Sequence, residues 1–395
     1  MSSAPVSSTP VSGKRPRVAV VYHFFAHYRE AVVGRLARSG KARFTFFGDD
    51  HDYESAIKAG SFTPPIDHRA CPTHRIRGSW MWQPGLVRVA ASREFDQLIL
   101  LGNPYWIATW IGAIVGRLTG KRVMFWSHGF LTPPKGLKGW MRRVFFHLAH
   151  EQLFYGRGAK ANAVALGWDP RRIHVIGNSL DLDRQAAARA ATDSAAISAC
   201  RTNLFQRPEL PTVICSCRLQ PKKRLDLLVD AAARLAKLGE AVNVIIIGDG
   251  PERARLEELA RHQEVSVHFE GACYDESRIA LLTMASDLTV CPGFIGLTAI
   301  HSMAYGVPVI TNKRSSDEAP EVESIIPGRT GDLFEDGDAD DLVRVMRPWL
   351  HRSADRRAVR AACIDMVERH WSPDSQLNAI ERAVIGHSPI DGDYP

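Results

Sequence analysis

The sequence has no apolar run long enough to cross a membrane and no apolar core near its start. The longest such run, Tyr105 to Val115, falls short of the roughly 20 residues that a spanning helix needs. The opening residues, MSSAPVSSTPVSGKRPR, do not have the pattern of a signal peptide, and their Ser and Pro content predicts a disordered tail over 1–16. We therefore expect no membrane span, although attachment to a membrane surface stays open.

Cysteine is scarce, and metal-ligand and nucleic-acid motifs are missing. Seven scattered Cys predict a reducing compartment such as the cytoplasm, and the alternation of Cys215 and Cys217 favours burial in a strand. No cluster of His, Cys, Asp or Glu has ligand spacing, so neither a metal nor another cofactor is expected. The net charge of +7 suits a phosphorylated ligand or a membrane surface, whereas no signature supports a nucleic-acid partner.

Short apolar strands alternate with helical patterns throughout, which is typical of parallel α/β sheets. In the first half, strands are expected at 17–24, 44–47, 97–101, 122–127, 152–155 and 173–176. In the second half they are expected at 212–217, 242–247, 265–269, 287–291 and 307–311, with helices between them. The sequence therefore predicts an α/β protein with two doubly wound Rossmann-like domains that face a central cleft.

An Ala-rich, Pro-punctuated stretch interrupts this rhythm. We expect a linker over 181–211, between an N-terminal domain at 17–180 and a C-terminal domain at 212–370. A last helix is expected within 371–395, with Ser372 as its N-cap, and it is a candidate to cross back to the N-terminal domain.

The stretch CPGFIGLTAIHSMAYGVPVIT (291–311) contains no Asp, Glu, Lys or Arg. A strand is followed by a loop with Gly293 and Gly296 and then by a helix that Gly306 can end in the left-handed conformation. Unpaired N–H groups at a helix start bind anions, and here they belong to Leu297, Thr298 and Ala299. A tight turn that holds nothing is the alternative.

Two more loops are expected at the same edge of the second sheet. Arg218 follows its first strand and Lys223 stands where the next helix begins, so both cations would face the loop of Gly296. Two cations beside a helix N-terminus suit a diphosphate, whereas a solvated basic turn is the alternative. The neighbouring strand ends in a turn that is a weak signal by itself, formed by Gly248, Asp249 and Gly250.

In combination these motifs carry a resemblance. The second domain resembles the donor domain of family 4 glycosyltransferases, which have the two-domain GT-B fold. The resemblance covers most of 212–350, through R-L-x-x-x-K (218–223), G-D-G-P (248–251), F-x-G (269–271), G-L…M-A-x-G-x-P-V-I (296–310) and G-R-T-G-D-L-F (328–334). The first domain is similar more loosely, through WSHGF (126–130) and the segment 155–181.

The resemblance implies an enzyme that moves a hexose-type sugar, with retention of configuration, from a nucleotide diphosphate to a glycan or lipid-linked acceptor. It implies that Arg218 and Lys223 hold the diphosphate without a metal and that His128 is the catalytic contact to the donor sugar. Further donor contacts are implied for Gly248, Asp249, Gly250, Gly293, Gly296, Leu297 and Thr298. Relatives that use lipid-linked acceptors also imply peripheral attachment at the inner face of the cell membrane.

The sequence departs from the family pattern at two positions. The family usually has two Glu residues eight positions apart, and here they are Gly293 and His301. His301 can still hydrogen-bond a ribose or sugar hydroxyl, and a core histidine bonded to a backbone carbonyl is the alternative. Glu318 and Glu321 are candidates to replace the sugar contact. A non-catalytic nucleotide-sugar binder and a sugar-nucleotide epimerase remain alternative functions.

Two N-terminal segments carry further predictions. In HFFAHYREA (23–31), the two Phe residues are expected to pack, whereas His27 and Arg29 are candidates for the acceptor side. The pattern KGLKGWMRRVFFHLAH (135–150) is basic and amphipathic, so it can lie on an anionic membrane surface. A buried helix with solvated Lys and Arg is the alternative.

Overall fold

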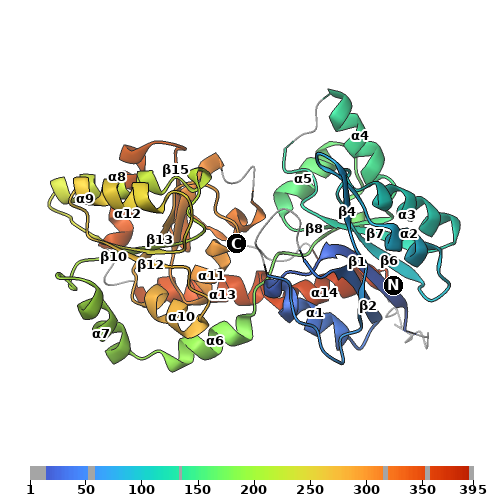
Figure 1. The fold of residues 1–395 in the computed structure, drawn as a ribbon, viewed down its shortest axis with the longest axis horizontal. Helices are drawn as coiled ribbons and strands as arrows, with labels where there is room; N and C mark the ends of the chain where they lie inside the picture. The colour runs from blue at the N-terminus through green and yellow to red at the C-terminus, as the bar shows by residue number, and fades with distance from the viewer. Residues whose placement is uncertain (1–14, 52–57, 133–135, 315–318, 352–355, 391–395) are drawn as a thin grey trace, which may run out of the picture.

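The computed structural model describes residues 15–51, 58–132, 136–314, 319–351 and 356–390. It contains two large parallel sheets, each flanked by helices, which lie side by side along the long axis of the molecule (Figure 1). The α/β fold class predicted from the sequence is therefore confirmed. Residues 1–14 of the expected tail, Glu318 and Lys135 lie outside the described residues.

The first sheet has seven parallel strands in the order β3-β2-β1-β6-β7-β8-β9. Its central strands are apolar on both faces because helices cover both sides, and residues 18–21 of β1 are fully buried. The strands are β1 (Arg17–Phe24), β2 (Arg43–Asp49), β3 (His68–Ala70), β6 (Gln97–Leu101), β7 (Arg122–Ser127), β8 (Glu151–Phe154) and β9 (Ile173–Val175).

The helices of this half are α1 (Glu30–Ala37), α2 (Pro84–Ala91), α3 (Ile107–Leu118), α4 (Gly136–Phe146) and α5 (Arg157–Ala165). A separate antiparallel hairpin, β4 (His74–Arg77) and β5 (Trp80–Trp82), was not expected, because β4 is short and exposed at every residue. Phe24 and Phe25 pack in the core as expected. Within the described part of the chain, no helix is both long and apolar enough to cross a bilayer.

The second sheet has six parallel strands in the order β12-β11-β10-β13-β14-β15. They are β10 (Thr212–Ser216), β11 (Asn243–Ile247), β12 (Val267–Gly271), β13 (Leu288–Cys291), β14 (Val309–Asn312) and β15 (Gly331–Phe334). The helices are α8 (Leu225–Lys237), α9 (Arg253–His262), α10 (Glu276–Met284), α11 (Thr298–Ala304), α12 (Ala339–Leu350) and α13 (Arg356–His370). Gly306 ends α11 with a φ of 78°, as expected for a glycine after a helix.

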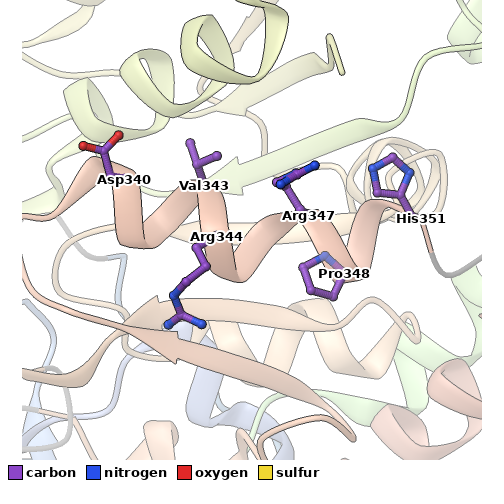
Figure 2. A pocket seen from close by; sticks show the side chains of 6 residues that line it. All are labelled: Asp340, Val343, Arg344, Arg347, Pro348 and His351. Atoms are coloured by element: carbon purple, nitrogen blue, oxygen red, sulfur yellow. The ribbon is translucent and has the colours of Figure 1, made fainter. Parts of the chain in front are cut away.

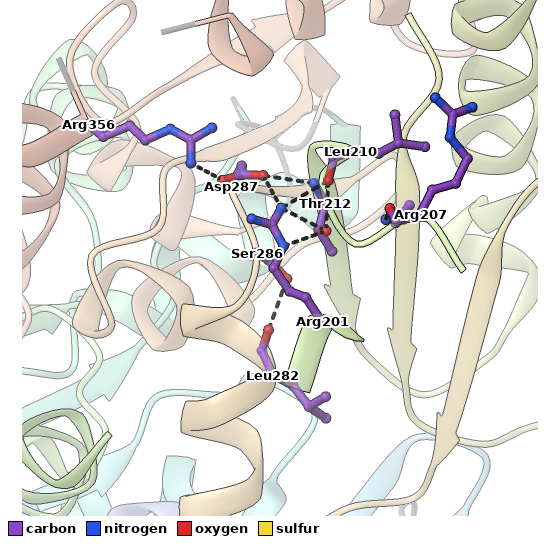
Figure 3. A network of polar contacts seen from close by, with 9 residues as sticks. Arg201, Arg207, Leu210, Thr212, Leu282, Ser286, Asp287 and Arg356 are labelled. Atoms are coloured by element: carbon purple, nitrogen blue, oxygen red, sulfur yellow. Dashed lines mark hydrogen bonds and ion pairs between the residues drawn. The ribbon is translucent and has the colours of Figure 1, made fainter. Parts of the chain in front are cut away.

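The segment expected as a linker forms two helices, α6 (Leu182–Ala191) and α7 (Ser194–Leu204), that pack with the second sheet. Cys200 and Phe205 share a core with Ile214 of β10. Arg201 of α7 donates to Asp287, 2.8 Å away, and the same carboxylate accepts from the backbone of Thr212 (Figure 3). These contacts attach α7 to the beginnings of β10 and β13, so this part of the segment is structured by the second sheet.

The last helix, α14 (Pro373–Val384), begins with the expected capping box of Ser372. It packs against α1, and its Ile380, Ala383 and Val384 belong to the core of the first sheet. In Figure 1 it runs under the first sheet, although α13 before it lies with the second. The chain therefore passes between the two halves twice, once before α6 and once before α14.

Candidate functional site

Two loops at the carboxyl edge of the second sheet are joined through their backbones. After β10, the N–H of Leu219 donates to Asp249 O at 2.9 Å, and Cys217 N–H donates to Ile247 O at 2.9 Å. The loops approach so closely that a Cβ on Gly248 would lie 1.9 Å from Cys217 O. Gly250 meets Leu219 O in the same way, at 2.3 Å. These two glycines, proposed from sequence as donor contacts, have a structural reason to be glycine.

The third loop is tied to the basic turn after β10. Gly293 is buried, and its N–H donates to Lys223 O at 3.0 Å; a Cβ there would lie 2.1 Å from Lys222 O. Lys223 Nζ in turn donates to Phe294 O at 2.6 Å and lies 4.9 Å from the centre of the Phe294 ring. The expected meeting of Lys223 with this loop is therefore present. The N–H of Gly293, in contrast, is already used within the protein.

The start of α11 is adjacent to these loops. The Thr298 hydroxyl donates to Ser216 O, 2.9 Å away at the end of β10, which brings the helix start next to the strand that Arg218 follows. The backbone N–H groups of Gly296, Leu297 and Thr298 have no hydrogen-bond acceptor among the described residues. The side chain of Arg218 is exposed, and no described residue forms an ion pair with it. This edge therefore presents two cations and several N–H donors.

His301 has a partner that neither sequence-based interpretation anticipated. Its Nε2 lies 2.7 Å from Oε1 of Glu276, at the start of α10, and the hydroxyl of Tyr305 donates to the same oxygen. Burial by itself raises the pKa of Glu276, but the hydrogen bond and charge of His301 outweigh it and lower that pKa. A backbone carbonyl is thus not the partner of this ring. The pair places a carboxylate beside the position where the family pattern has one.

Glu321 and Glu323, in the turn Pro320–Ser324 after β14, reach the first half of the chain. Glu321 is 3% exposed and accepts from Asn178 Nδ2 at 2.8 Å. Glu323 accepts from the backbone N–H groups of Arg157 and Gly158 at the start of α5, each at 2.8 Å. Burial raises the pKa of both carboxyls. Glu321, expected as a candidate sugar contact, is thus buried and uses one oxygen to join the two halves.

His128 follows β7 at the carboxyl edge of the first sheet. Its ring packs on the ring of Tyr155, with centroids 4.7 Å apart. His128 is exposed to solvent, but many protein atoms also surround its ring. The pKa of His128 is lowered to about 4, mainly because these atoms desolvate the imidazole and secondly because Arg29 is positively charged. The ring is therefore uncharged at neutral pH, with one nitrogen available to accept a hydrogen bond.

The two residues expected on the acceptor side differ from each other. His27 is exposed, and its Nδ1 lies 3.2 Å from Lys58 O. Arg29 is buried and donates to the hydroxyls of Tyr22 and Tyr155. Arg29, the other candidate for the acceptor side, is therefore enclosed by aromatic residues of β1 and β7 and by Tyr155, which follows β8.

Other polar groups give no comparable site. A hollow on the outer face of α12 is lined by Asp340, Val343, Arg344, Arg347, Pro348 and His351 (Figure 2). Its Arg347 is paired with Glu240 at 2.6 Å, so its charge is already balanced. In the described residues, ligand atoms of Asp49, Asp50 and His51 also come within 4.8 Å of one another at the end of β2. That group is explained by ion pairs of the histidine with both carboxylates.

Comparison with known proteins shows what the second half of the chain is similar to. Residues 201–364 match the family described as glycosyl transferases group 1. This part of the chain is similar to a group 1 glycosyltransferase domain, and residues 201–364 are called the group 1 domain after this likeness. The group 1 domain contains all three loops of the second sheet, and it begins within α7, which agrees with the packing of that helix.

Related proteins share this domain. The chain is 34% identical over 102 residues to a GDP-mannose-dependent alpha-(1-6)-phosphatidylinositol dimannoside mannosyltransferase of Mycobacterium tuberculosis, covering 25% of this chain and 26% of that protein. It is 31% identical over 170 residues to the sulfoquinovosyl transferase SQD2 of Arabidopsis thaliana, covering 41% of this chain and 31% of the other. The chain thus spans less than half the length of the curated relatives that it matches.

Solved structures extend the likeness to the first half. The Anabaena protein Alr3699/HepE, in complex with UDP, is similar with a TM-score of 0.69 at 18% identity, over 94% of this chain and all of that one. A glycosyltransferase from Rickettsia africae has a TM-score of 0.70 at 14% identity, over 95% of this chain and all of that one. At such low identity the likeness concerns the fold: both sheets together form the GT-B arrangement.

Proposed function

We propose that the protein is a glycosyltransferase that moves a sugar from a nucleotide-diphosphate donor to a glycan or lipid-linked acceptor. The observation that carries this proposal is the edge of the group 1 domain, where no described carboxylate pairs with the exposed Arg218 and Lys223 is held on the loop of Phe294. Their charges, with the N–H groups at the start of α11, suit a diphosphate. The relatives named for GDP-mannose and the likeness to a UDP complex support a sugar nucleotide as donor.

The proposed chemistry needs charge stabilisation on the leaving group. As the bond between the sugar and the diphosphate breaks, negative charge develops on the diphosphate, and the two fixed cations stabilise it. No step requires a metal. His128, uncharged at neutral pH, contacts the donor sugar from the first sheet. Retention of configuration follows from the resemblance to family 4 and is tested by the anomeric proton of the product in an NMR spectrum.

A thermal-shift panel tests donor binding directly. A ligand that binds only the folded protein increases the free energy of unfolding, by about 2.7 kcal/mol at a ligand concentration 100-fold above Kd. The melting temperature of the protein rises as a consequence. GDP-mannose, UDP-glucose, GDP and UDP are compared, with and without EDTA. We expect one base to raise the melting temperature, equally with EDTA. No shift with any of them, or a shift that EDTA abolishes, would contradict the proposal.

The alternative is a non-catalytic nucleotide-sugar binder, and the loss of the two usual Glu residues favours it. The two candidates separate on turnover. Incubation of the stabilising sugar nucleotide with an acceptor mixture releases the nucleoside diphosphate if the protein is a transferase, and a binder releases none. The pair of His301 and Glu276 supports the active candidate, because it supplies a carboxylate beside the position of the missing one.

We propose in addition that the first half attaches to an anionic membrane surface at the cytoplasmic side. On α4, Leu137 is 80% exposed and Trp140 is 63% exposed. The neighbouring α3, joined to α4 by the ring contact of Trp110 with Phe145 at 4.9 Å, exposes Ile114 and Leu118. Neither helix contains an acidic residue. Apolar side chains that stand among cations suit an anionic bilayer.

Not every cation of α4 takes part in this surface. Arg142 is turned inward: it donates to Gly129 O at 2.7 Å, and burial lowers its pKa. Lys138 and Arg143 remain, and no described carboxylate pairs with them. The membrane surface is therefore defined by Leu137, Lys138, Trp140, Arg143, Ile114 and Leu118.

A further inference from the structure

Arg29 is a buried cation, and no acidic residue in the described part of the chain pairs with it. Only 8% of the residue is exposed, in the short 3-10 turn that follows β1. Nη2 donates to the hydroxyl of Tyr155 at 2.6 Å and to that of Tyr22 at 3.3 Å. Nη1 is buried and has no hydrogen-bond partner among the described residues. A charged group in this condition is costly to bury, so its retention calls for a physical account.

Aromatic groups surround the guanidinium. Its carbon lies 4.5 Å from the ring centre of Tyr22 and 5.3 Å from that of Trp126. Cation–π attraction and the two phenol oxygens stabilise the charge but do not cancel it. Burial raises the pKa of Tyr155 well above its usual value, so the phenol keeps its proton. A full positive charge therefore remains in a region of low dielectric, where it acts strongly on its neighbours.

His128 is the neighbour that this charge reaches. Its ring packs on Tyr155, the same side chain that Arg29 holds by its shorter hydrogen bond. One tyrosine thus touches both the cation and the imidazole. The lowered pKa of His128, caused first by crowding and then by Arg29, agrees with this geometry.

The other charged and titratable groups around this cluster do not neutralise Arg29. From β1 come Tyr22 and His23, whose rings pack together at 4.8 Å, and from the 3-10 turn comes Tyr28. From the second half, Glu323 reaches the start of α5, directly after Tyr155, but its two oxygens accept from backbone N–H groups there. No described carboxylate forms an ion pair with Arg29.

We propose that Arg29 is a positioning residue for His128: it fixes Tyr155 against the imidazole and brings a buried positive charge close to that ring. An uncharged ring can accept a hydrogen bond from a hydroxyl, whereas an imidazolium can only donate. The role toward a sugar hydroxyl rests on the proposed function. The electrostatic coupling between Arg29 and His128 does not, and it is measured without any substrate.

The test is an NMR titration of the histidine ring protons between pH 3.5 and 8 (an interval chosen around the usual histidine value of roughly 6.5). The protein has 15 His, and the resonance of His128 is assigned by its loss in His128→Gln. Three variants are compared with wild type. Arg29→Met removes the charge and keeps an unbranched chain, and Arg29→Lys keeps a charge. Arg38→Met serves as the control, because it removes an exposed arginine at the end of α1.

We expect Arg29→Met to raise the midpoint of His128 by roughly one pH unit or more, the usual effect of removing a nearby like charge. Arg29→Lys is expected to restore most of the wild-type midpoint, and Arg38→Met to leave it unchanged. If Arg29→Met does not fold, Tyr155→Phe tests the same coupling, because it removes the acceptor that fixes the guanidinium. A folded Arg29→Met or Tyr155→Phe protein with the wild-type midpoint would overturn the proposal.

A transfer assay adds a second readout that a merely structural role would not change. The acid limb of the pH–rate profile should move upward in Arg29→Met and return in Arg29→Lys. The two proposals fail separately. A shifted midpoint in a protein that transfers no sugar would reject the proposed function and keep the coupling, whereas an unshifted midpoint in an active transferase would reject the coupling alone.

Discussion

The loops after the first strand of each sheet contain cations in opposite surroundings. In the second sheet, Arg218 follows β10, is exposed and has no acidic partner in the described part of the chain. In the first, Arg29 follows β1 and is enclosed by aromatic rings, and no described carboxylate pairs with it. Water around Arg218 is easily displaced by an incoming anion, so that side chain is suited to recruit a ligand. Arg29 cannot be reached, so it acts through its field on groups already present.

Equivalent places in two doubly wound sheets therefore do not imply equivalent roles. Access to solvent and the partners already present decide what a cation does. Two other cations can be ordered by how far their charge is already satisfied. Lys223 donates one hydrogen bond to Phe294 O, whereas Arg347 forms an ion pair with Glu240. Four predictions test this order, and the variants expected to change the protein most come first.

The first prediction concerns the packing of the Gly248 loop against the loop that contains Arg218. Gly248→Ala would place a Cβ 1.9 Å from Cys217 O, so the loops must separate. We expect a loss of about 1–3 kcal/mol in the free energy of unfolding, as for overpacked sites, together with loss of nucleotide binding. Gly239→Ala is the matched control, because Gly239 also has a positive φ but an added Cβ meets nothing within 4 Å. Equal denaturation midpoints for the two variants would refute the account of these loops.

The second prediction removes the exposed cations themselves. Arg218→Ala and Lys223→Ala should each weaken binding of the nucleoside diphosphate by on the order of 1.5–3 kcal/mol, measured by calorimetry. Lys222→Ala is the control, because it removes a positive charge from the same turn without removing the hydrogen bond that Lys223 Nζ donates to Phe294 O. Wild-type affinity in both single variants would place the diphosphate elsewhere.

The third prediction concerns the paired histidine. Glu276 has a lowered pKa in the folded protein, so its pairing contributes stability above the unfolded pKa of about 4.5, and this contribution is lost as the pH falls through the folded pKa. His301→Ala should therefore cost about 1–3 kcal/mol at pH 7 and flatten the acid side of the stability curve. His301→Glu would bring a second carboxylate to Glu276, so its stability should instead recover as the solution is acidified. Parallel curves for wild type and His301→Ala would contradict this pairing.

The fourth prediction compares two basic helix faces. On α4, Lys138 and Arg143 have no described acidic partner, whereas on α12 Arg344 is paired with Asp341 and Arg347 with Glu240. Replacing both α4 cations by Gln should weaken binding to anionic vesicles by about 2 kcal/mol in total, at ~1 kcal/mol per charge. The same replacement of the two α12 arginines should leave co-sedimentation unchanged. An equal loss in both variants would mean that net charge alone governs the attachment.

Much of the fold could be predicted because it is encoded in local patterns. The apolar runs of β1, β10 and β11 and the glycine that ends α11 need only their immediate neighbours in sequence. The hairpin of β4 and β5 was missed because its strands are short and mostly exposed, so no apolar periodicity marks them.

The site was predicted only in part, for the same physical reason. Lys223 was placed correctly because the spacing between a strand end and the next helix determines where its side chain lies. The partner of His301 stands 25 residues away on another helix, and no local pattern announces it. The burial of Arg29 depends on the rings of Tyr22, Trp126 and Tyr155, which are far apart in the sequence, so the local pattern HYR could not predict the enclosure.

The position of α14 affects when the first half can finish folding during translation. Residues Ile380, Ala383 and Val384 of this helix complete a core that also contains residues of β1 and α1, which are synthesised well before α14. At a typical rate of about 5–20 residues per second, the ribosome needs on the order of tens of seconds to add everything between β9 and α14. We expect the half that is made first to finish folding last, and a ribosome-bound chain that lacks α14 to stay sensitive to protease in its first sheet.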